Sequence, residues 1–264
     1  MGAGRPVAVV ARSGVGQQQV ASLARRLGLP LAPAGGGGDG FRLRMTETGL
    51  ELLPPGADGA GPVRVDFAGG RNAHRRRFGG GAGQPLARAV GLKGGLRPRV
   101  LDATAGMGRD AFVLATLGCE VTLVERSPVV WALLEDGIRR AAGAGDPELR
   151  AIASRMRPVF ADAIGHLEGL PEAAAPDVVY LDPMYPVSGK TARAKKEMRV
   201  VRELLGGDGD SPRLLAAALG CARCRVVVKR PARAGFLGGE RPSMSIGSPN
   251  TRYDVYVRRG MISR

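Results

Sequence analysis

Residues 100–118 read Val100-Leu-Asp-Ala-Thr-Ala-Gly-Met-Gly-Arg-Asp-Ala-Phe-Val-Leu-Ala-Thr-Leu-Gly118. A short apolar run ends at Asp102, two glycines follow, and apolar residues then recur at near-helical spacing. This order predicts a strand, a glycine turn and a helix, the opening unit of a doubly wound α/β sheet. Because a Cβ at Gly106 or Gly108 would stand between the backbone amides and a ligand, we interpret both glycines and Asp102 as ligand-binding residues.

A second acid, Glu125, ends the next apolar run, roughly 20 residues after Asp102. An acid at this separation accepts hydrogen bonds from ribose hydroxyls, both in dinucleotide sites and in sites for S-adenosylmethionine (SAM). The turn favours SAM, because it lacks the third glycine of a pyrophosphate-binding G-x-G-x-x-G turn. Asp110 would also repel a pyrophosphate, whereas it would attract a cationic sulfonium. An NAD-dependent oxidoreductase is the alternative enzyme class.

The third predicted strand, Arg157-Pro-Val-Phe-Ala-Asp162, also ends in an acid. Ligands of a doubly wound sheet bind outside the carboxyl ends of its strands, so Asp162 can accept a hydrogen bond from an adenine amino group. Asp162 can equally cap the following helix, and both roles can hold together.

The stretch Asp177-Val-Val-Tyr-Leu-Asp-Pro-Met-Tyr-Pro186 contains an apolar run typical of a buried parallel strand, which stops at an acid and a proline. The lone pair of an exocyclic base amine is drawn into the ring, so methylation of such an amine needs acceptors that orient its N–H groups. Asp182 and the Pro183 carbonyl can be these acceptors, and Tyr185 offers a ring on which the base can stack. These three residues are the predicted catalytic residues.

Composition sets broad limits on the function. The chain has 264 residues, of which 44% are hydrophobic, enough for a packed core. No apolar run reaches the roughly 18 residues of a membrane helix and the N-terminus lacks a secretion signal, so we expect a cytoplasmic location. Cys221 and Cys224 form a single C-x-x-C pair, and with two histidines in the chain we expect no metal site.

The charge favours a polyanionic partner, because 39 basic residues face 24 acidic ones for a formal net charge of +15. Residues 71–99 include Arg75, Arg76 and Arg77 and contain no acid, and a glycine-flanked arginine run of this kind suits an RNA backbone. Further candidate RNA-binding residues, at the predicted pocket or at a strand end, are Lys195, Lys196, Lys229 and Arg230.

The pattern divides the chain into residues 1–65, 66–99 and 100–264. The first part predicts a small α+β unit, with a strand at 7–10, a helix at 17–27 and a hairpin from 41–45 and 50–53. Residues 63–67 alternate like a strand and lead into the second part, a basic connecting segment rich in glycine and arginine. The third part carries the doubly wound sheet, and its last strands, at 243–246 and 253–257, are predicted to pair antiparallel.

Seven motifs, in this order along the chain, resemble the RsmJ family of bacterial methyltransferases, which act on guanine N2 in 16S ribosomal RNA. The motifs are Val65-Asp-Phe-Ala-Gly-Gly, His74-Arg-Arg-Arg-Phe-Gly-Gly-Gly, Asp102-Ala-Thr-Ala-Gly-Met-Gly-Arg-Asp-Ala-Phe, Val124-Glu-Arg-Ser-Pro-Val-Val, Tyr180-Leu-Asp-Pro-Met-Tyr-Pro, Lys195-Lys-Glu-Met-Arg and Val226-Val-Val-Lys-Arg-Pro.

The resemblance implies a class I SAM-dependent methyltransferase with a Rossmann-like sheet, acting on 16S rRNA or the small ribosomal subunit. It also implies SAM contacts at Arg109, Asp110, Glu125, Arg126, Asp162, Ala163 and Asp182. Relatives often carry small hydroxyl residues after the third strand, where this chain has Asp162-Ala163. A non-enzyme alternative is an RNA-binding ribosome assembly factor that keeps the sheet without turnover.

Overall fold

Seven strands form the larger of two sheets in the computed structural model, which describes residues 5–33, 40–56, 61–69, 81–184, 196–206 and 209–261. The strand order is β6-β5-β4-β7-β8-β10-β9, with the strands from β6 to β8 parallel and β10 antiparallel to both β8 and β9. The strands are β4 (Val100–Asp102), β5 (Val121–Glu125), β6 (Met156–Phe160), β7 (Val178–Leu181), β8 (Arg225–Pro231), β9 (Met244–Gly247) and β10 (Thr251–Val257). The predicted doubly wound sheet with an antiparallel last strand is confirmed.

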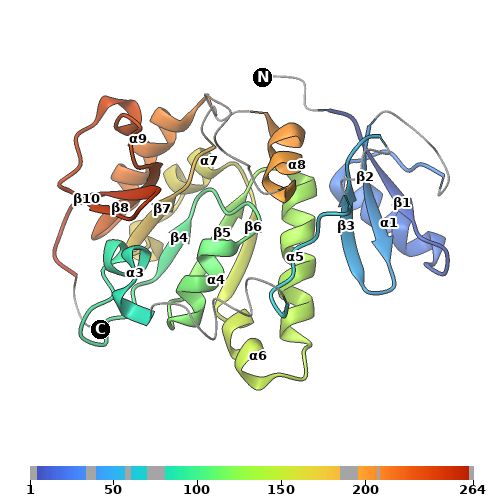
Figure 1. The fold of residues 1–264 in the computed structure, drawn as a ribbon, viewed down its shortest axis with the longest axis horizontal. Helices are drawn as coiled ribbons and strands as arrows, with labels where there is room; N and C mark the ends of the chain where they lie inside the picture. The colour runs from blue at the N-terminus through green and yellow to red at the C-terminus, as the bar shows by residue number, and fades with distance from the viewer. Residues whose placement is uncertain are drawn as a thin grey trace.

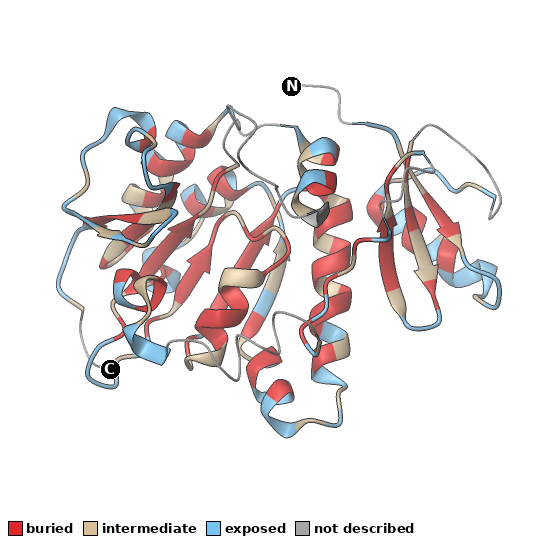
Figure 2. Cartoon of the chain, viewed as in Figure 1, coloured by how far each residue is buried: buried red, intermediate tan, exposed pale blue. Residues whose placement is uncertain are grey.

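Alternate residues of the central strands enter two hydrophobic cores, one on each face of this sheet. Val178 and Tyr180 of β7 belong to one core, and Val179 and Leu181 belong to the other. Successive side chains of a strand point to opposite faces, so a strand covered on both faces is apolar throughout. Figure 2 shows the buried strands in red in the middle of the domain.

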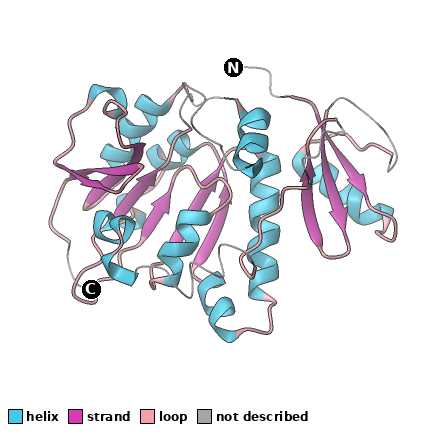
Figure 3. Cartoon of the chain, viewed as in Figure 1, coloured by secondary structure: helices cyan, strands magenta, loops and turns pink. Residues whose placement is uncertain are grey.

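Helices cover both faces of the sheet (Figure 1, Figure 3). The core that contains Tyr180 also takes side chains from α3, α4, α5, α6 and α8, and the core that contains Leu181 takes side chains from α7 and α9. These helices are α3 (Pro85–Val90), α4 (Arg109–Thr116), α5 (Pro128–Ala142), α6 (Pro147–Ala153), α7 (Ala163–Glu168), α8 (Lys196–Leu205) and α9 (Ser211–Cys221). None of the helices in the described ranges is both long and apolar enough to span a membrane.

The caps of two helices fix the strand ends that precede them. Ser127 accepts a hydrogen bond from the Val130 backbone N–H at 3.4 Å, and Pro128 takes the first position of α5, as the sequence predicts. Asp162 caps α7 by accepting from the Gly165 N–H at 2.9 Å. The chain therefore turns sharply into a helix after both β5 and β6, at the same edge of the sheet.

A smaller sheet is formed by β1 (Val7–Ala11), β2 (Phe41–Thr46) and β3 (Gly49–Leu53), in that order. The predicted hairpin is present, since β2 pairs antiparallel with β3, and β1 pairs parallel with β2. The helix α1 (Gln17–Leu27) packs on β1 and ends at Gly28, which has a φ of 64°. A left-handed glycine at this position is a common helix stop.

Asp136 of α5 bonds the smaller sheet to this helix, and the residue is buried, with 4% of its surface exposed. Its carboxylate accepts a hydrogen bond from the Leu50 backbone N–H at 3.0 Å and pairs with Arg139 and Arg140 of its own helix. Figure 1 shows α5 standing between the two sheets. This carboxylate therefore bonds β3 to the larger domain, and apolar side chains of β3 and α5 share one core beside it.

The prediction of a strand at residues 63–67 is wrong, because only one residue of this segment pairs. Val63 exchanges two backbone hydrogen bonds of 2.8 Å with Leu52. Val65 then lies against Gly137 of α5, where a Cβ would have no room, and Phe67 stacks on Phe112 of α4 with ring centroids 4.9 Å apart. The predicted division of the chain at residues 65 and 99 stays a prediction.

Candidate active site

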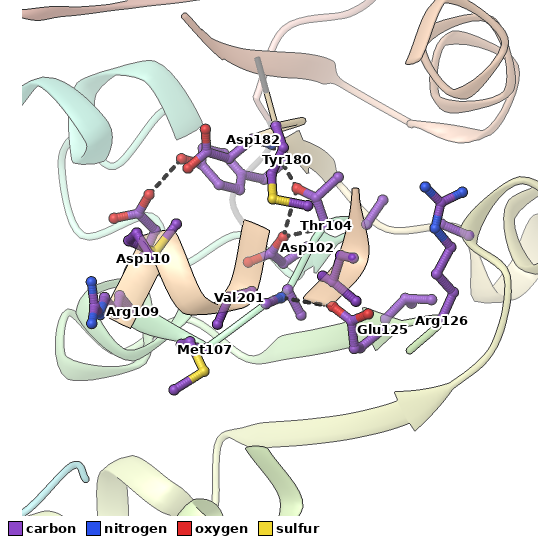
Figure 4. A pocket seen from close by; sticks show the side chains of 18 of the residues that line it. Asp102, Thr104, Met107, Arg109, Asp110, Glu125, Arg126, Tyr180, Asp182 and Val201 are labelled. Carbon is purple, nitrogen blue, oxygen red and sulfur yellow. Dashed lines mark hydrogen bonds between the residues drawn. The ribbon is translucent and has the colours of Figure 1, made fainter. Parts of the chain in front are cut away.

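A cavity of about 750 Å³ opens at the carboxyl ends of β4, β5, β7 and β8. Its other walls come from the first turn of α4, the start of α7, one face of α8 and the segment around Val65. Figure 4 shows side chains from β4, α4, β5, β7 and α8 gathered around one space. The predicted cofactor-binding residues that line it are Asp102, Gly106, Arg109, Asp110, Glu125, Arg126, Asp162, Ala163 and Asp182. The sheet topology has thus gathered residues that are spread over 80 positions of the sequence (182 − 102).

The two glycines of the turn after β4 serve different purposes. Gly106 has a φ of 52°, and the nearest atom to a Cβ built there is the Thr104 carbonyl oxygen at 3.8 Å, so a side chain would project into open cavity. Gly108 has a φ of 67°, but a Cβ there would meet Leu134 Cδ1 at 2.6 Å and Phe67 Cζ at 3.2 Å. The interpretation of Gly108 as a ligand-approach residue is therefore corrected, because its missing side chain makes room for the core.

Glu125 links the turn to the tip of β5. One carboxylate oxygen, Oε2, accepts from the Gly106 N–H at 3.0 Å, and the other, Oε1, accepts from the Ser127 N–H at 2.7 Å. The residue is 7% exposed and lines the cavity. The carboxylate is therefore held in place at the cavity wall, and a carboxylate at this strand tip is the group that accepts from the hydroxyls of a ribose in doubly wound folds.

The third strand tip adds Asp162, Ala163 and Ile164 to the cavity wall. Asp162 Oδ2 is engaged in capping α7, as one of its two predicted roles required. Nearby, Arg126 pairs with Asp210 at 2.6 Å, and both residues line the cavity. The ion pair joins the tip of β5 to the segment before α9.

Asp182 stands directly after β7, where the sequence places it. Its backbone N–H donates to the Thr104 hydroxyl at 2.6 Å, and the Thr104 N–H donates to Asp102 Oδ1 at 3.1 Å. The hydroxyl of Thr104 therefore ties the tip of β4 to the tip of β7. Among the predicted catalytic residues, Asp182 lines the cavity, Pro183 is buried beside it, and Tyr185 lies outside the described residues.

Lys229, at the end of β8, lies between two carboxylates of the cavity. Its Nζ is 2.6 Å from Asp110 Oδ2 and 2.8 Å from Asp182 Oδ2. The Tyr180 hydroxyl donates to the same Asp110 oxygen at 2.7 Å, as Figure 4 shows. We predicted that Lys229 and Arg230 bind RNA phosphates; the structure instead pairs Lys229 with acids and buries Arg230, which donates to the Gly235 carbonyl. These contacts point away from a phosphate role for either side chain.

Burial and charge shift the pKa values of this cluster. Burial raises the pKa of Asp102 to about 8, and the neighbouring carboxylates of Asp110 and Asp182 add to the rise. Burial also raises the pKa of Asp182, against the lowering effect of Lys229. For Lys229 itself, burial lowers the pKa, but Asp110 and Asp182 outweigh it and raise the pKa above its ordinary value, so this ammonium stays charged.

Several cavity residues were not predicted from the sequence. Met198, Val201 and Leu205 come from one face of α8, and Arg64 and Val65 come from the segment that precedes the basic region. Thr104 and Tyr180 lie inside the quoted motifs. A polar side chain at or near a strand tip is the sequence feature that could have identified both as cavity residues. The predicted RNA-binding residues Arg75, Arg76, Arg77 and Lys195 lie outside the described residues, as does the side chain of Lys196, the first residue of α8.

The residues of the cavity fit SAM better than a dinucleotide. Gly106 leaves open space over the turn, Glu125 is held by backbone N–H groups at a position that suits a ribose, and Ala163 and Ile164 form an apolar wall beside Asp162 that suits an adenine. Acids at the ends of β4 and β7 and in the first turn of α4 suit a cationic ligand and oppose a pyrophosphate. A sheet of this topology with this kind of cavity belongs to the class I SAM-dependent methyltransferases.

Comparison with known proteins gives the family. Residues 22–258 match the sequence model of a family described as "Putative SAM-dependent methyltransferase". The chain is 54% identical over 238 residues to the Ribosomal RNA small subunit methyltransferase J of Pseudomonas paraeruginosa, covering 90% of this chain and 89% of the relative. It is 50% identical over 259 residues to the protein of the same name from Pseudomonas syringae pv. tomato, covering 98% and 94% of the two chains.

A solved structure agrees with this assignment. The crystal structure of a SAM-dependent methyltransferase from Neisseria gonorrhoeae superposes with a TM-score of 0.74 at 35% identity and covers 95% of each chain. The chain therefore belongs to the family of SAM-dependent methyltransferases that these proteins represent, and the resemblance to the RsmJ family is confirmed. SAM is its methyl donor, and the NAD-dependent alternative is not supported.

Proposed function

We propose that this protein transfers a methyl group from SAM to the exocyclic N2 of a guanosine in small-subunit ribosomal RNA. The observation that carries the proposal is the position of Asp182, which shares one cavity with the glycine turn and Glu125. Its relatives named Ribosomal RNA small subunit methyltransferase J support the substrate class. The choice of guanine N2 is supported by the Asp182-Pro183 pair after β7 and by the family resemblance.

The cavity residues perform separate parts of this reaction. When bound, SAM supplies a methyl group on a sulfonium: the amine lone pair forms the new C–N bond, the C–S electrons stay on sulfur, and one N–H proton leaves. Glu125 holds the ribose, and Gly106 leaves the turn open above it. Asp182 accepts a hydrogen bond from the target amine, which orients the nitrogen and stabilises the positive charge that develops on it. The carboxylate can then accept the departing proton.

We also propose that the target base reaches Asp182 by leaving its stack and that Tyr185 packs on its face, as expected for an enzyme that modifies a base edge. The arginines at 75–77 and the lysines at 195 and 196 are proposed to bind the flanking phosphates. A Tyr185→Leu variant keeps an apolar side chain without the ring, and we expect it to reduce transfer more than it reduces RNA affinity.

The direct test uses purified protein, labelled SAM and small-subunit RNA from cells that lack this enzyme. We expect label in the RNA, and mass spectrometry of nuclease fragments is expected to locate it as N2-methylguanosine at one position. Label at another base atom would reject the N2 assignment and keep the methyltransferase. Tight RNA binding without any label, with SAM bound, would favour the assembly-factor alternative.

A further inference from the structure

Three acids and one lysine meet at the part of the cavity where the target amine is proposed to bind. Asp102, Asp110 and Asp182 come from β4, α4 and the end of β7, and the Lys229 ammonium contacts two of them within 2.8 Å. The Lys229 side chain is 26% exposed and that of Asp182 is 40% exposed, so this pair faces the cavity and is not sealed in the core. Lys229 is therefore in a position to influence the charge and the orientation of Asp182.

We propose that Lys229 is a positioning residue for methyl transfer, whose ammonium holds Asp182 against Asp110 and keeps Asp182 an anionic acceptor for the target amine. The proposal rests on the proposed function of this cavity. Lys229 engages Oδ2 of Asp182, which leaves Oδ1 for a hydrogen bond from a bound amine. Because the Asp182 N–H is also held by the Thr104 hydroxyl, both ends of this residue are fixed.

The charges around Asp182 explain why a cation is needed there. Burial and the carboxylate of Asp110 favour the protonated form of Asp182, and a protonated carboxyl could neither attract the developing positive charge nor take up the proton. Lys229 from β8 opposes this directly, and Arg202 from α8 opposes it from farther away. The hydroxyl of Tyr180 faces Asp110, to which it donates.

Lys229 is also suited to this task because it does not exchange protons itself. Its ammonium is held by two carboxylates and stays charged over the working pH range, so the proton released by the amine goes to Asp182 and not to the lysine. A lysine in this position acts through the carboxylate, and its loss would be felt in the transfer rate and its pH dependence more than in ligand affinity.

The test compares Lys229→Met, which removes the charge and keeps the length, with Lys229→Arg, which keeps the charge. Aspartate labelled with ¹³C at the carboxyl group reports the titration of Asp182, whose resonance is identified by its loss in Asp182→Asn. We expect the Asp182 midpoint to move to higher pH in Lys229→Met and to stay near its original value in Lys229→Arg. The matched control is Arg252→Met, which removes a cation from Asp254 in the neighbouring strand β10, outside the cavity.

The second readout is single-turnover transfer to small-subunit RNA at saturating SAM. In Lys229→Met we expect the rate near neutral pH to fall on the order of 10²-fold, with the acid limb of the pH–rate profile moved upward and partial recovery at high pH. Lys229→Arg is expected to rescue most of the rate. Affinity for S-adenosylhomocysteine, measured by calorimetry, should change much less than the transfer rate, because Lys229 reaches the donor only through Asp110 and Asp182.

Two results would overturn the proposal. One is a Lys229→Met protein whose Asp182 titration and acid limb both stay at the original pH. The other is equal damage in Lys229→Met and Lys229→Arg, with a lowered melting temperature and an unmoved acid limb. This is the pattern expected of the control Arg252→Met, and it would make the lysine structural only. Absence of transfer by the unaltered protein would instead reject the RNA methyltransferase function, and the carboxyl titration would still decide whether Lys229 sets the charge of Asp182.

Discussion

Acids occur both at the smaller sheet and at the carboxyl edge of the larger sheet, but the two places neutralise their charge differently. Glu51 of β3 pairs with the Arg44 guanidinium at 2.7 Å, and Asp136 under the smaller sheet pairs with two arginines and a backbone N–H. At the larger sheet, Asp110 and Asp182 share one lysine ammonium beside the buried Asp102. Fully paired acids hold parts of the chain together, whereas acids in excess leave negative charge available for a cationic donor and an amine.

The largest expected effect concerns Asp182, an acid at the carboxyl edge of the larger sheet. Asp182→Ala removes the proposed acceptor, and we expect methyl transfer to fall on the order of 10³-fold, or about 4 kcal/mol in the barrier. Label transfer measures this, and filter binding should show RNA affinity within about twofold of normal, since uniform binding is retained. Normal transfer with weakened RNA binding would show that Asp182 is a docking residue.

Loss of Asp136, an acid that is fully paired, should reduce the stability of the protein and not its methyl transfer. Asp136→Ala leaves Arg139, Arg140 and the Leu50 N–H without their shared carboxylate, and we expect the free energy of unfolding to drop by about 3 kcal/mol. Urea denaturation measures the drop. The neighbouring Glu135, which pairs with Arg26 at the surface, provides the control: Glu135→Ala should cost less than about 1 kcal/mol. Equal losses in both variants would contradict the proposed attachment.

Gly106 and Gly108, in the turn after β4, allow a second comparison, between an effect on SAM binding and an effect on stability. Gly108→Ala places a methyl group against Leu134 and Phe67, so it should lower stability by about 2 kcal/mol through overpacking. Gly106→Ala has open space and should cost about 1 kcal/mol for its positive φ, but its methyl group enters the cavity and should weaken SAM binding. Calorimetry with SAM and urea denaturation separate the two effects. A stronger effect of Gly108→Ala on binding than on stability would restore its role as a ligand-approach residue.

The smallest expected effect is a pH dependence. Burial raises the pKa of Asp102 to about 8, so this acid is mainly neutral at pH 7 and mainly anionic at pH 9. An anion in this position attracts the sulfonium of SAM more than the neutral sulfide of S-adenosylhomocysteine. The ratio of the two affinities should therefore rise a few-fold, up to about tenfold, between pH 7 and pH 9. The rise should disappear in Asp102→Asn, and a ratio that stays constant in the unaltered protein would show that Asp102 does not face the sulfur.

Local sequence patterns predicted most of the fold, because strands buried on both faces, glycine stops and proline at a helix start leave local signals. The helix from Gln17, the hairpin, and the antiparallel pairing of β9 with β10 are all predicted by such local signals. The segment at residues 63–67 alternates like a strand, yet its apolar side chains are used against α5 and α4 and not in a sheet. Alternation indicates burial on one side, and it does not reveal what provides that burial.

The sequence predicts single residues of the site from their positions at strand ends, but it does not predict contacts between residues that are distant in the chain. Glu125 and Asp182 follow from their positions at strand tips. The contact of Lys229 with Asp110 spans 119 residues, and it depends on β8 lying next to β7 and on the first turn of α4 facing both. Only the strand order reveals that Lys229, at this basic strand end, meets two acids of the cavity.

The segment around Val65 has a practical consequence for work on shortened forms of this protein. Arg64 and Val65 form part of the cavity wall, while Val63 is bonded to Leu52 of the smaller sheet. A form that begins at residue 100 would lose this wall together with the Phe67 ring that packs on α4. Such a fragment would keep every acid of the reaction centre and still present the donor to open water, so a minimal catalytic domain should retain the first hairpin.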